Sequence, residues 1–250
     1  MSKPLALVTG SAKRLGAAMA LRLAREGFRL AIHCNTSISE AREVVALIRD
    51  SGGEAQLFAA DLAQPEAAAD LWARVTESMG PIALLVNNAS TFHHDDLLGL
   101  DEAAFDNHLA VNLKAPVRLI EAMANQSPTP DGALVVNMLD NKVFAPNPDF
   151  FTYSLSKAGL ETATKLSAMR LAGRVRVCAI APSITLISGA QSEAEFQASA
   201  RINPLHRRVQ PEDICDALLY LWQDKRLTGE ILAVDAGQAL LRLPRDVAFL

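Results

Sequence analysis

Two residues suited to proton transfer, Tyr153 and Lys157, stand four positions apart in the run Tyr153-Ser154-Leu155-Ser156-Lys157. On a helix this spacing puts both side chains on one face, with the lysine ammonium near the tyrosine phenol. A nearby cation favours tyrosinate, so we expect the pKa of Tyr153 to fall below its ordinary value of about 10. Such a tyrosine can give a proton to a substrate that has just accepted a hydride.

Asp140 precedes this tyrosine and limits the chemistry that is plausible. An ionised carboxylate beside the phenol would raise the pKa of Tyr153 and repel a developing alkoxide, which disfavours ketone reduction. Asp140 must therefore stay protonated, or face a substrate rich in N–H donors and basic nitrogen. A pterin supplies the second condition, because it has an exocyclic amino group, ring N–H groups and reducible C=N bonds.

A turn that contains two glycines is expected between the first strand and the first helix, with the sequence Thr9-Gly10-Ser11-Ala12-Lys13-Arg14-Leu15-Gly16. Gly10 permits a tight turn, and Gly16 lets the helix pack closely against the sheet. The helix N-terminus then offers N–H groups to a pyrophosphate. The guanidinium of Arg14 could hold a phosphate and reach a substrate acceptor. The alternative is a surface arginine whose charge opposes the helix dipole.

Short apolar runs alternate with longer amphipathic segments along the chain. Several runs are almost continuously apolar, which is typical of parallel strands covered on both faces. The expected strands are 5–9, 29–34, 55–59, 82–87, 133–138, 175–180 and 231–235, and the expected helices are 15–26, 39–50, 64–78, 101–124, 152–171, 192–200 and 211–223. This order predicts an α/β fold, a single-domain Rossmann doubly wound sheet of seven mainly parallel strands with helices on both faces.

We expect residues 1–250 to form one dinucleotide-binding catalytic domain with an insertion at about 182–210. The insertion begins apolar and then becomes polar. It follows the carboxyl end of a strand, where a substrate lid would sit. A variable surface loop is the equal alternative.

Composition excludes several classes of function. The chain has 250 residues and a formal net charge of −4, without a long block of Lys and Arg, so nucleic-acid binding has no electrostatic footprint. No apolar stretch approaches the roughly 18 residues that a membrane span needs. The chain enters its first strand without room for a signal peptide. We expect Cys34, Cys178 and Cys215 to be buried thiols, as in proteins of a reduced compartment. We expect a soluble cytoplasmic protein.

Residues 93–96, His-His-Asp-Asp, look like a metal-ligand cluster. Four consecutive positions cannot converge on one metal without unusual backbone geometry, so we expect a solvated loop and no metal site. His108 has no evident partner in the sequence.

The quoted residues resemble those of the short-chain dehydrogenase/reductase family. Within it the likeness is to the pteridine reductases and the related dihydromonapterin and dihydrofolate reductases, over essentially the whole chain. The wider family usually has a neutral Ser at the position of Asp140 and a glycine at that of Arg14. The matching segments are 9–16, His33 with Ser37, Asn87-Asn88-Ala89-Ser90-Thr91-Phe92, Asn137-Met138-Leu139-Asp140, Tyr153 with Lys157, and Ala181-Pro182-Ser183.

The resemblance implies a role for each matching position. The catalytic residues would be Asn112, Asp140, Tyr153 and Lys157, with Asn112 holding a water in a proton relay with the lysine. Arg14, Ser90, Asp140 and Tyr153 would contact the pterin, and Phe92 would stack on its ring against the nicotinamide. The cofactor would be bound by Gly10, Lys13, Arg14, Leu15, His33, Asn35, Thr36, Ser37, Asp61, Leu62, Asn88, Ala89, Ser90, Tyr153, Lys157, Pro182, Ser183 and Ile184.

The expected cofactor is NADPH. NAD-preferring enzymes of this fold end the second strand with an acid for the ribose hydroxyls. Here that strand ends without one, and Lys13 and Arg14 lie in the neighbouring turn, which suits a 2′-phosphate. Against this, Thr36 occupies the position where protozoan-type pteridine reductases have an arginine.

The sequence therefore predicts an NADPH-dependent reductase of a dihydropterin, dihydromonapterin or dihydrofolate. Hydride would reach a ring C=N bond, with Tyr153 and Asp140 supplying the proton. Two alternatives remain: a short-chain carbonyl reductase acting on a ketone or ketoacyl substrate, and a non-catalytic NADP-binding regulator. The resemblance also implies a homotetramer formed through the helices at 101–124 and 152–171.

Overall fold

The computed structural model describes residues 3–187 and 191–250 as one seven-stranded sheet in the order β3-β2-β1-β4-β5-β6-β7. Every neighbouring pair of described strands runs parallel. The strands are β1 Leu5–Val8, β2 Arg29–Cys34, β3 Ala55–Ala59, β4 Leu84–Asn87, β5 Leu134–Met138, β6 Arg176–Pro182 and β7 Ile231–Val234. The predicted doubly wound single domain is confirmed.

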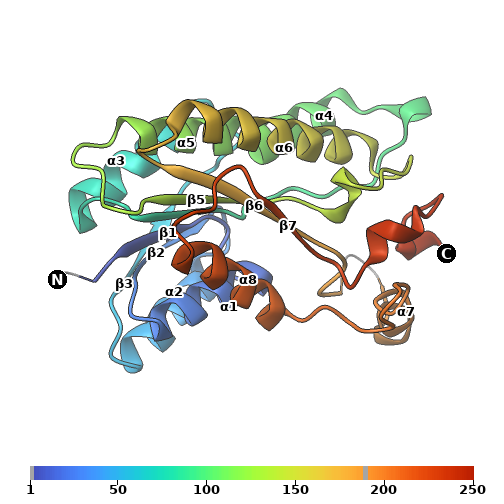
Figure 1. The fold of residues 1–250 in the computed structure, drawn as a ribbon, viewed down its shortest axis with the longest axis horizontal. Helices are drawn as coiled ribbons and strands as arrows, with labels where there is room; N and C mark the ends of the chain where they lie inside the picture. Colours follow the sequence, from blue (N-terminus) through green and yellow to red (C-terminus); the bar gives the residue numbers. More distant parts are fainter. Residues whose placement is uncertain (1–2, 188–190) are drawn as a thin grey trace.

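Helices cover both faces of this sheet (Figure 1). α1, α2 and α8 lie on one face, and α3, α4, α5 and α6 on the other, whereas α7 lies beyond one end of the sheet. The bounds are α1 Arg14–Arg25, α2 Ile38–Asp50, α3 Ala67–Met79, α4 Glu102–Leu109, α5 Ala115–Asn125, α6 Phe151–Leu171, α7 Glu193–Ser199 and α8 Pro211–Gln223.

β1 shows why the strands are continuous apolar runs, because all four of its residues are buried. Ala6 and Val8 pack in the core beneath α1, α2 and α8, whereas Leu5 and Leu7 pack in the core on the opposite face. Side chains alternate across a strand, so a strand covered on both faces needs apolar residues at every position. Each fully buried leucine contributes about 1.5–3 kcal/mol of hydrophobic free energy.

The predicted helix at 101–124 is interrupted in the structure. α4 ends at Leu109, a π-helical turn spans Ala110–Lys114, and α5 begins at Ala115. Such turns often occur at functional sites, and this one carries Asn112. The third helix begins at Ala67, later than predicted, because Asp61 closes a turn by accepting a hydrogen bond from the Ala63 N–H.

The topology places a crevice at the carboxyl ends of β1 and β4. From β1 the chain proceeds to β2 and β3 on one side and then returns to β4 on the other, which makes a topological switch point. The Thr9 hydroxyl joins the two strand ends by accepting hydrogen bonds of 2.9 Å from the N–H groups of Asn88 and Ala89. Ligands of doubly wound sheets bind at this place.

Within residues 3–187 and 191–250, no helix is both long and apolar enough to cross a membrane. The same ranges contain no group of three or more His, Cys, Asp or Glu side chains arranged to hold a metal ion. Cys34, Cys178 and Cys215 are buried, free thiols.

Gly16→Ala tests the close approach of α1 to the crevice. A Cβ at this position would lie 2.2 Å from the Gly10 carbonyl oxygen, so we expect the free energy of unfolding to fall by about 1–3 kcal/mol. Urea unfolding measures it. Gly99→Ala is the control, because a Cβ there meets nothing within 4 Å. Equal stability of the two variants would contradict the prediction.

Candidate active site

A cleft of about 1250 Å³ opens at the carboxyl ends of the strands. It runs from the turn at Gly10 and Arg14 to Asp140, Tyr153 and Lys157. Small-molecule sites usually occupy about 300–1,000 Å³. The cleft therefore has room for a dinucleotide and a second molecule.

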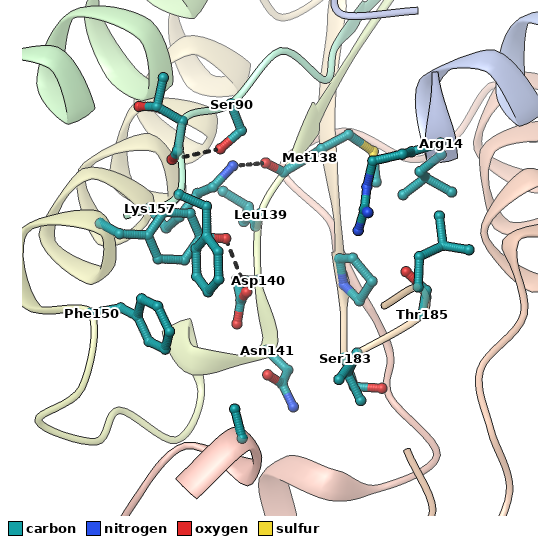
Figure 2. Close-up of a pocket in the computed structure, with 18 of the residues that line it drawn as sticks. Arg14, Ser90, Met138, Leu139, Asp140, Asn141, Phe150, Lys157, Ser183 and Thr185 are labelled. Carbon is teal, nitrogen blue, oxygen red and sulfur yellow. Dashed lines mark hydrogen bonds between the residues drawn. The ribbon is translucent and has the colours of Figure 1, made fainter. Parts of the chain in front are cut away.

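The structure brings Tyr153 and Asp140 into direct contact, and Figure 2 marks this contact with a dashed line at Asp140. The Tyr153 hydroxyl donates a 3.0 Å hydrogen bond to Asp140 Oδ2. Asp140 follows β5, and its Oδ1 accepts a 2.9 Å hydrogen bond from the Lys142 N–H in the turn that starts there. Tyr153 lies in the first turn of α6. The strand end and the helix start thus hold the carboxyl and the phenol together.

The electrostatics differ in one respect from the sequence prediction. Burial, and secondarily Asp140, raise the pKa of Tyr153 well above 10. The expectation that Lys157 lowers the phenol pKa is therefore wrong. Lys157 Nζ instead donates a 2.8 Å hydrogen bond to the Met138 carbonyl, and burial lowers the pKa of this ammonium to about 8. Burial also raises the pKa of Asp140. Asp140 thus raises the pKa of Tyr153, as predicted for a carboxylate beside the phenol, and Tyr153 is neutral.

An aromatic stack continues from this pair. The Phe92 ring lies 4.7 Å from the Tyr153 ring in a T-shaped contact and is stacked on Phe150 at 4.2 Å. Both arrangements are favourable for aromatic rings. Phe92, which was predicted to contact substrate, thus lies directly beside the phenol and lines the cleft.

Asn112 holds the loop that carries Ser90. Its Oδ1 accepts hydrogen bonds from the Ser90 hydroxyl (3.1 Å) and the Thr91 N–H (2.8 Å). Its Nδ2 donates to the Thr91 carbonyl and to the Ser156 hydroxyl. The Asn112 side chain lies outside the described lining of the cleft, and a part in a proton relay stays a prediction.

The loop at 93–96 is anchored in the protein. The prediction of a solvated loop is therefore wrong for Asp95, its third residue. Asp95 is buried and accepts hydrogen bonds from the N–H and the hydroxyl of Thr152. The His108 ring lies 2.7 Å from the same hydroxyl and accepts a bond from the His93 N–H. These contacts fix the loop next to Phe92 because they join it to the first turn of α6.

At the opposite end of the cleft, His33 supports the glycine turn. The Gly10 N–H donates to His33 Nδ1 at 3.0 Å, so Nε2 carries the proton and donates to the Ala60 carbonyl at 3.1 Å. Burial lowers the pKa of His33 to about 4, and the ring is neutral at pH 7. His33 lines the cleft, but both of its ring nitrogens are bonded to backbone.

Arg14 adopts a left-handed backbone conformation with φ of 55°. Glycine adopts this conformation without strain, whereas other residues pay roughly 1–2 kcal/mol for it. The Arg14 guanidinium donates a 2.6 Å hydrogen bond to the Ile187 carbonyl in the predicted insertion. Figure 2 shows Arg14 on the opposite side of the pocket from Lys157 and Asp140.

The structure gathers most of the predicted residues along the cleft. Thr36 and Ser37 lie outside the lining that the described residues form, at the start of α2, where Ser37 is the N-terminal cap. The predicted residues that do line it are Gly10, Lys13, Arg14, Leu15, His33, Asn35, Asp61, Leu62, Asn88, Ala89, Ser90, Phe92, Asp140, Tyr153, Lys157, Pro182, Ser183 and Ile184.

Among the lining residues that sequence reasoning missed are Phe150 and the residues from Asp246 to Leu250. Phe150 precedes α6 with a left-handed backbone (φ 56°), so no helical spacing in the sequence indicates it. The residues from Asp246 to Leu250 follow the last strand without periodicity, and no pattern in the sequence indicates that they fold back.

Lys157→Met tests the buried ammonium through the pH dependence of stability. With a native pKa of about 8, against about 10.4 when unfolded, the unfolded protein binds more protons between these values. Stability of the wild type relative to the variant should therefore rise between about pH 8 and 10, by up to about 1.4 kcal/mol per pH unit. Urea unfolding of both proteins measures it. A difference that is independent of pH would contradict the prediction.

Comparisons with known proteins agree with this geometry. A family model described as Enoyl-(Acyl carrier protein) reductase matches residues 10–239. The crystal structure of FolM alternative dihydrofolate reductase 1 from Brucella canis, complexed with NADP, superposes with a TM-score of 0.92 and 42% identity over 96% of this chain and 95% of that one.

Two curated relatives cover a similar share. An uncharacterised oxidoreductase of Mycobacterium tuberculosis is 34% identical over 93% of this chain and 90% of its own. The 3-oxoacyl-[acyl-carrier-protein] reductase FabG of Staphylococcus epidermidis is 29% identical over 93% of this chain and 97% of its own. The chain belongs to the short-chain dehydrogenase/reductase family of oxidoreductases.

Proposed function

We propose that the protein is an NADPH-dependent reductase of a pteridine, which transfers hydride to a ring C=N bond. The observation that carries the proposal is the 3.0 Å hydrogen bond from the Tyr153 hydroxyl to the half-buried Asp140 carboxyl. An ionised carboxyl at this position would repel the alkoxide that forms in ketone reduction. A basic ring nitrogen gains a hydrogen-bonding partner and a source of protons.

The start of α1 supports dinucleotide binding. Lys13 occupies the N-cap position without a side-chain cap, and the first turn of α1, which is fully described, holds no acidic residue. The amide groups there fit a pyrophosphate. A Cβ on Gly10 would lie 2.9 Å from Ala89 Cα, so the turn at Gly10 lies close to the backbone of Ala89. Bound NADPH supplies the hydride, and a similar FolM structure contains NADP.

Lys13 supports a preference for the 2′-phosphate. Its Nζ lies 2.6 Å from Glu40 Oε1, and both side chains are partly exposed. A phosphate would compete with Glu40 for this ammonium. At the end of β2, Asn35 donates a hydrogen bond to Asp61.

Proton supply follows from the charges around the phenol. Neutral Tyr153 gives its proton to the ring nitrogen, and a protonated Asp140 then replaces it through their hydrogen bond. Burial raises the pKa of Asp140, which keeps this carboxyl protonated to a higher pH than usual. Below its pKa of about 8, the buried Lys157 is cationic and offsets the negative charge left on the pair. Arg14, Ser90 and Phe92 hold the ring.

A second candidate is a short-chain carbonyl reductase. The similarity to FabG favours it, because that relative is named as a 3-oxoacyl reductase. A non-catalytic NADP-binding regulator is the third, and the contact between Tyr153 and Asp140 argues against it.

We also propose a homotetramer. Exposed apolar residues on α6, Leu155, Leu166 and Met169, support an assembly through this helix.

Asp140→Ser, with Asp140→Asn as an isosteric control, tests the proposed function. Dihydrobiopterin, dihydromonapterin, dihydrofolate and simple ketones are compared by NADPH consumption. Loss of the acid should lower kcat/KM for the preferred pteridine by about 10²-fold or more in both variants, which is typical of general acid catalysis. Ketone turnover should not fall.

The wild type separates the candidates in the same assay. Robust ketone turnover without pteridine turnover would establish the carbonyl reductase. If NADPH were oxidised with none of the substrates, the regulator would be favoured.

Arg14→Gly separates substrate binding from folding. Glycine accommodates the φ of 55°, so the free energy of unfolding should stay equal or rise by up to about 1 kcal/mol. The KM for the pteridine should rise about tenfold, since a charged hydrogen bond is worth roughly 1.5–3 kcal/mol. Steady-state kinetics and urea unfolding measure both. An unchanged KM would remove Arg14 from the substrate site.

A further inference from the structure

Residues Arg245–Leu250, the closing segment, fold back over the substrate end of the cleft. Its residues from Asp246 onward line the cleft, and Val247–Phe249 form a short 3₁₀ turn. The Ser199 hydroxyl on α7 donates a 3.1 Å hydrogen bond to the Val247 carbonyl. Figure 1 shows this part of the chain next to α7 and away from the core of the sheet. Its place therefore depends on a few specific contacts.

The principal contact is a buried ion pair with Lys142. Lys142 Nζ lies 2.8 Å from Asp246 Oδ2, and the two side chains are only 6% and 15% exposed. The same ammonium donates a 2.7 Å hydrogen bond to Asn147 Oδ1. Charged groups removed from water need such partners. The ion pair thus favours one position of the closing segment.

A second anchor holds the same segment. Asp149 accepts hydrogen bonds from the Arg245 guanidinium, at 2.8 Å to Nε, and from the Asp246 N–H at 2.7 Å. Two carboxylate–cation pairs therefore join residues 142–149 to the closing segment. The closing segment supplies the carboxylate in the first pair and the cation in the second.

Lys142 also contacts the catalytic pair. Its backbone N–H donates a 2.9 Å hydrogen bond to Asp140 Oδ1, the oxygen that Tyr153 does not use. One residue therefore binds Asp140 through its backbone and Asp246 through its side chain. Replacing the side chain removes the second contact and leaves the first.

The closing segment adds Phe249 to the aromatic stack. The Phe249 ring is stacked on Phe150, with centroids 5.9 Å apart and an interplanar angle of 22°. Phe150 is stacked on Phe92, which meets Tyr153 edge to face. The His94 and Phe249 rings make a T-shaped contact, with centroids 5.2 Å apart. An aromatic wall thus extends from the phenol to the closing segment.

We propose that Lys142 is a positioning residue that holds the closing segment against the active site, and that Phe249 is a specificity-determining residue for the part of the substrate beyond its reduced ring. The assignment of Phe249 rests on the proposed function. The assignment of Lys142 rests on the contacts alone, and each has its own test.

Hydrogen exchange tests Lys142 without any substrate. In Lys142→Met and in Asp246→Asn, amides of the peptide 245–250 should exchange about tenfold faster or more, because the segment opens more readily. Lys165→Met is the matched control, since Lys165 pairs with Glu161 and does not line the cleft. Two substitutions on opposite sides of the ion pair guard against misfolding of one. Wild-type exchange in both variants would overturn the assignment.

Kinetics test Phe249. In Phe249→Ala the KM for the pteridine that the wild type reduces should rise about tenfold, with kcat and the Kd of NADPH changed little, because binding is lost equally in ground and transition states. Phe249→Tyr should restore the KM. An unchanged KM for the pteridine would overturn the role of Phe249, and so would a Kd of NADPH that rises together with this KM.

Failure of the proposed function is a separate outcome. If the wild type reduced only ketones, pteridine reduction would fail and the assignment of Phe249 with it, whereas the exchange of peptide 245–250 would still decide the role of Lys142.

Discussion

The hydrogen bond between Tyr153 and Asp140 is the contact on which the rest of the site depends. Burial disfavours a charge on either group and raises the pKa of both. A half-buried carboxyl next to a buried phenol is costly unless its oxygens are satisfied. Tyr153 and the Lys142 N–H satisfy them, one on each oxygen. The pair can therefore hold and pass a proton.

The surrounding fold keeps this pair in place from three directions. β5 ends just before Asp140, and Lys157 binds the last carbonyl of that strand. The buried contact of Asp95 with Thr152 fixes the start of α6, which carries Tyr153. The π-helical turn brings Asn112 to the loop at Ser90. Strand end, helix start and loop are each anchored by buried polar groups.

Much of this was predictable from the sequence, because periodicity and short motifs report local structure. The continuous apolar runs located the strands, and Tyr153 with Lys157 located one end of the cleft. The direction of the Tyr153 pKa was only partly predictable: Asp140 indicated an increase, whereas burial, the main cause, leaves no local pattern. The buried Asp95 was missed for the same reason. Contacts between distant segments leave no local pattern.

The central claim is that Asp140 and Tyr153 face a ring nitrogen of the substrate. A crystal structure of the protein with NADP⁺ and a bound pteridine tests it most directly. We predict a ring nitrogen at hydrogen-bonding distance, about 2.6–3.2 Å, from the Asp140 carboxyl or the Tyr153 hydroxyl. A pteridine bound with these groups turned away from its nitrogens, or bound outside the cleft, would contradict the account.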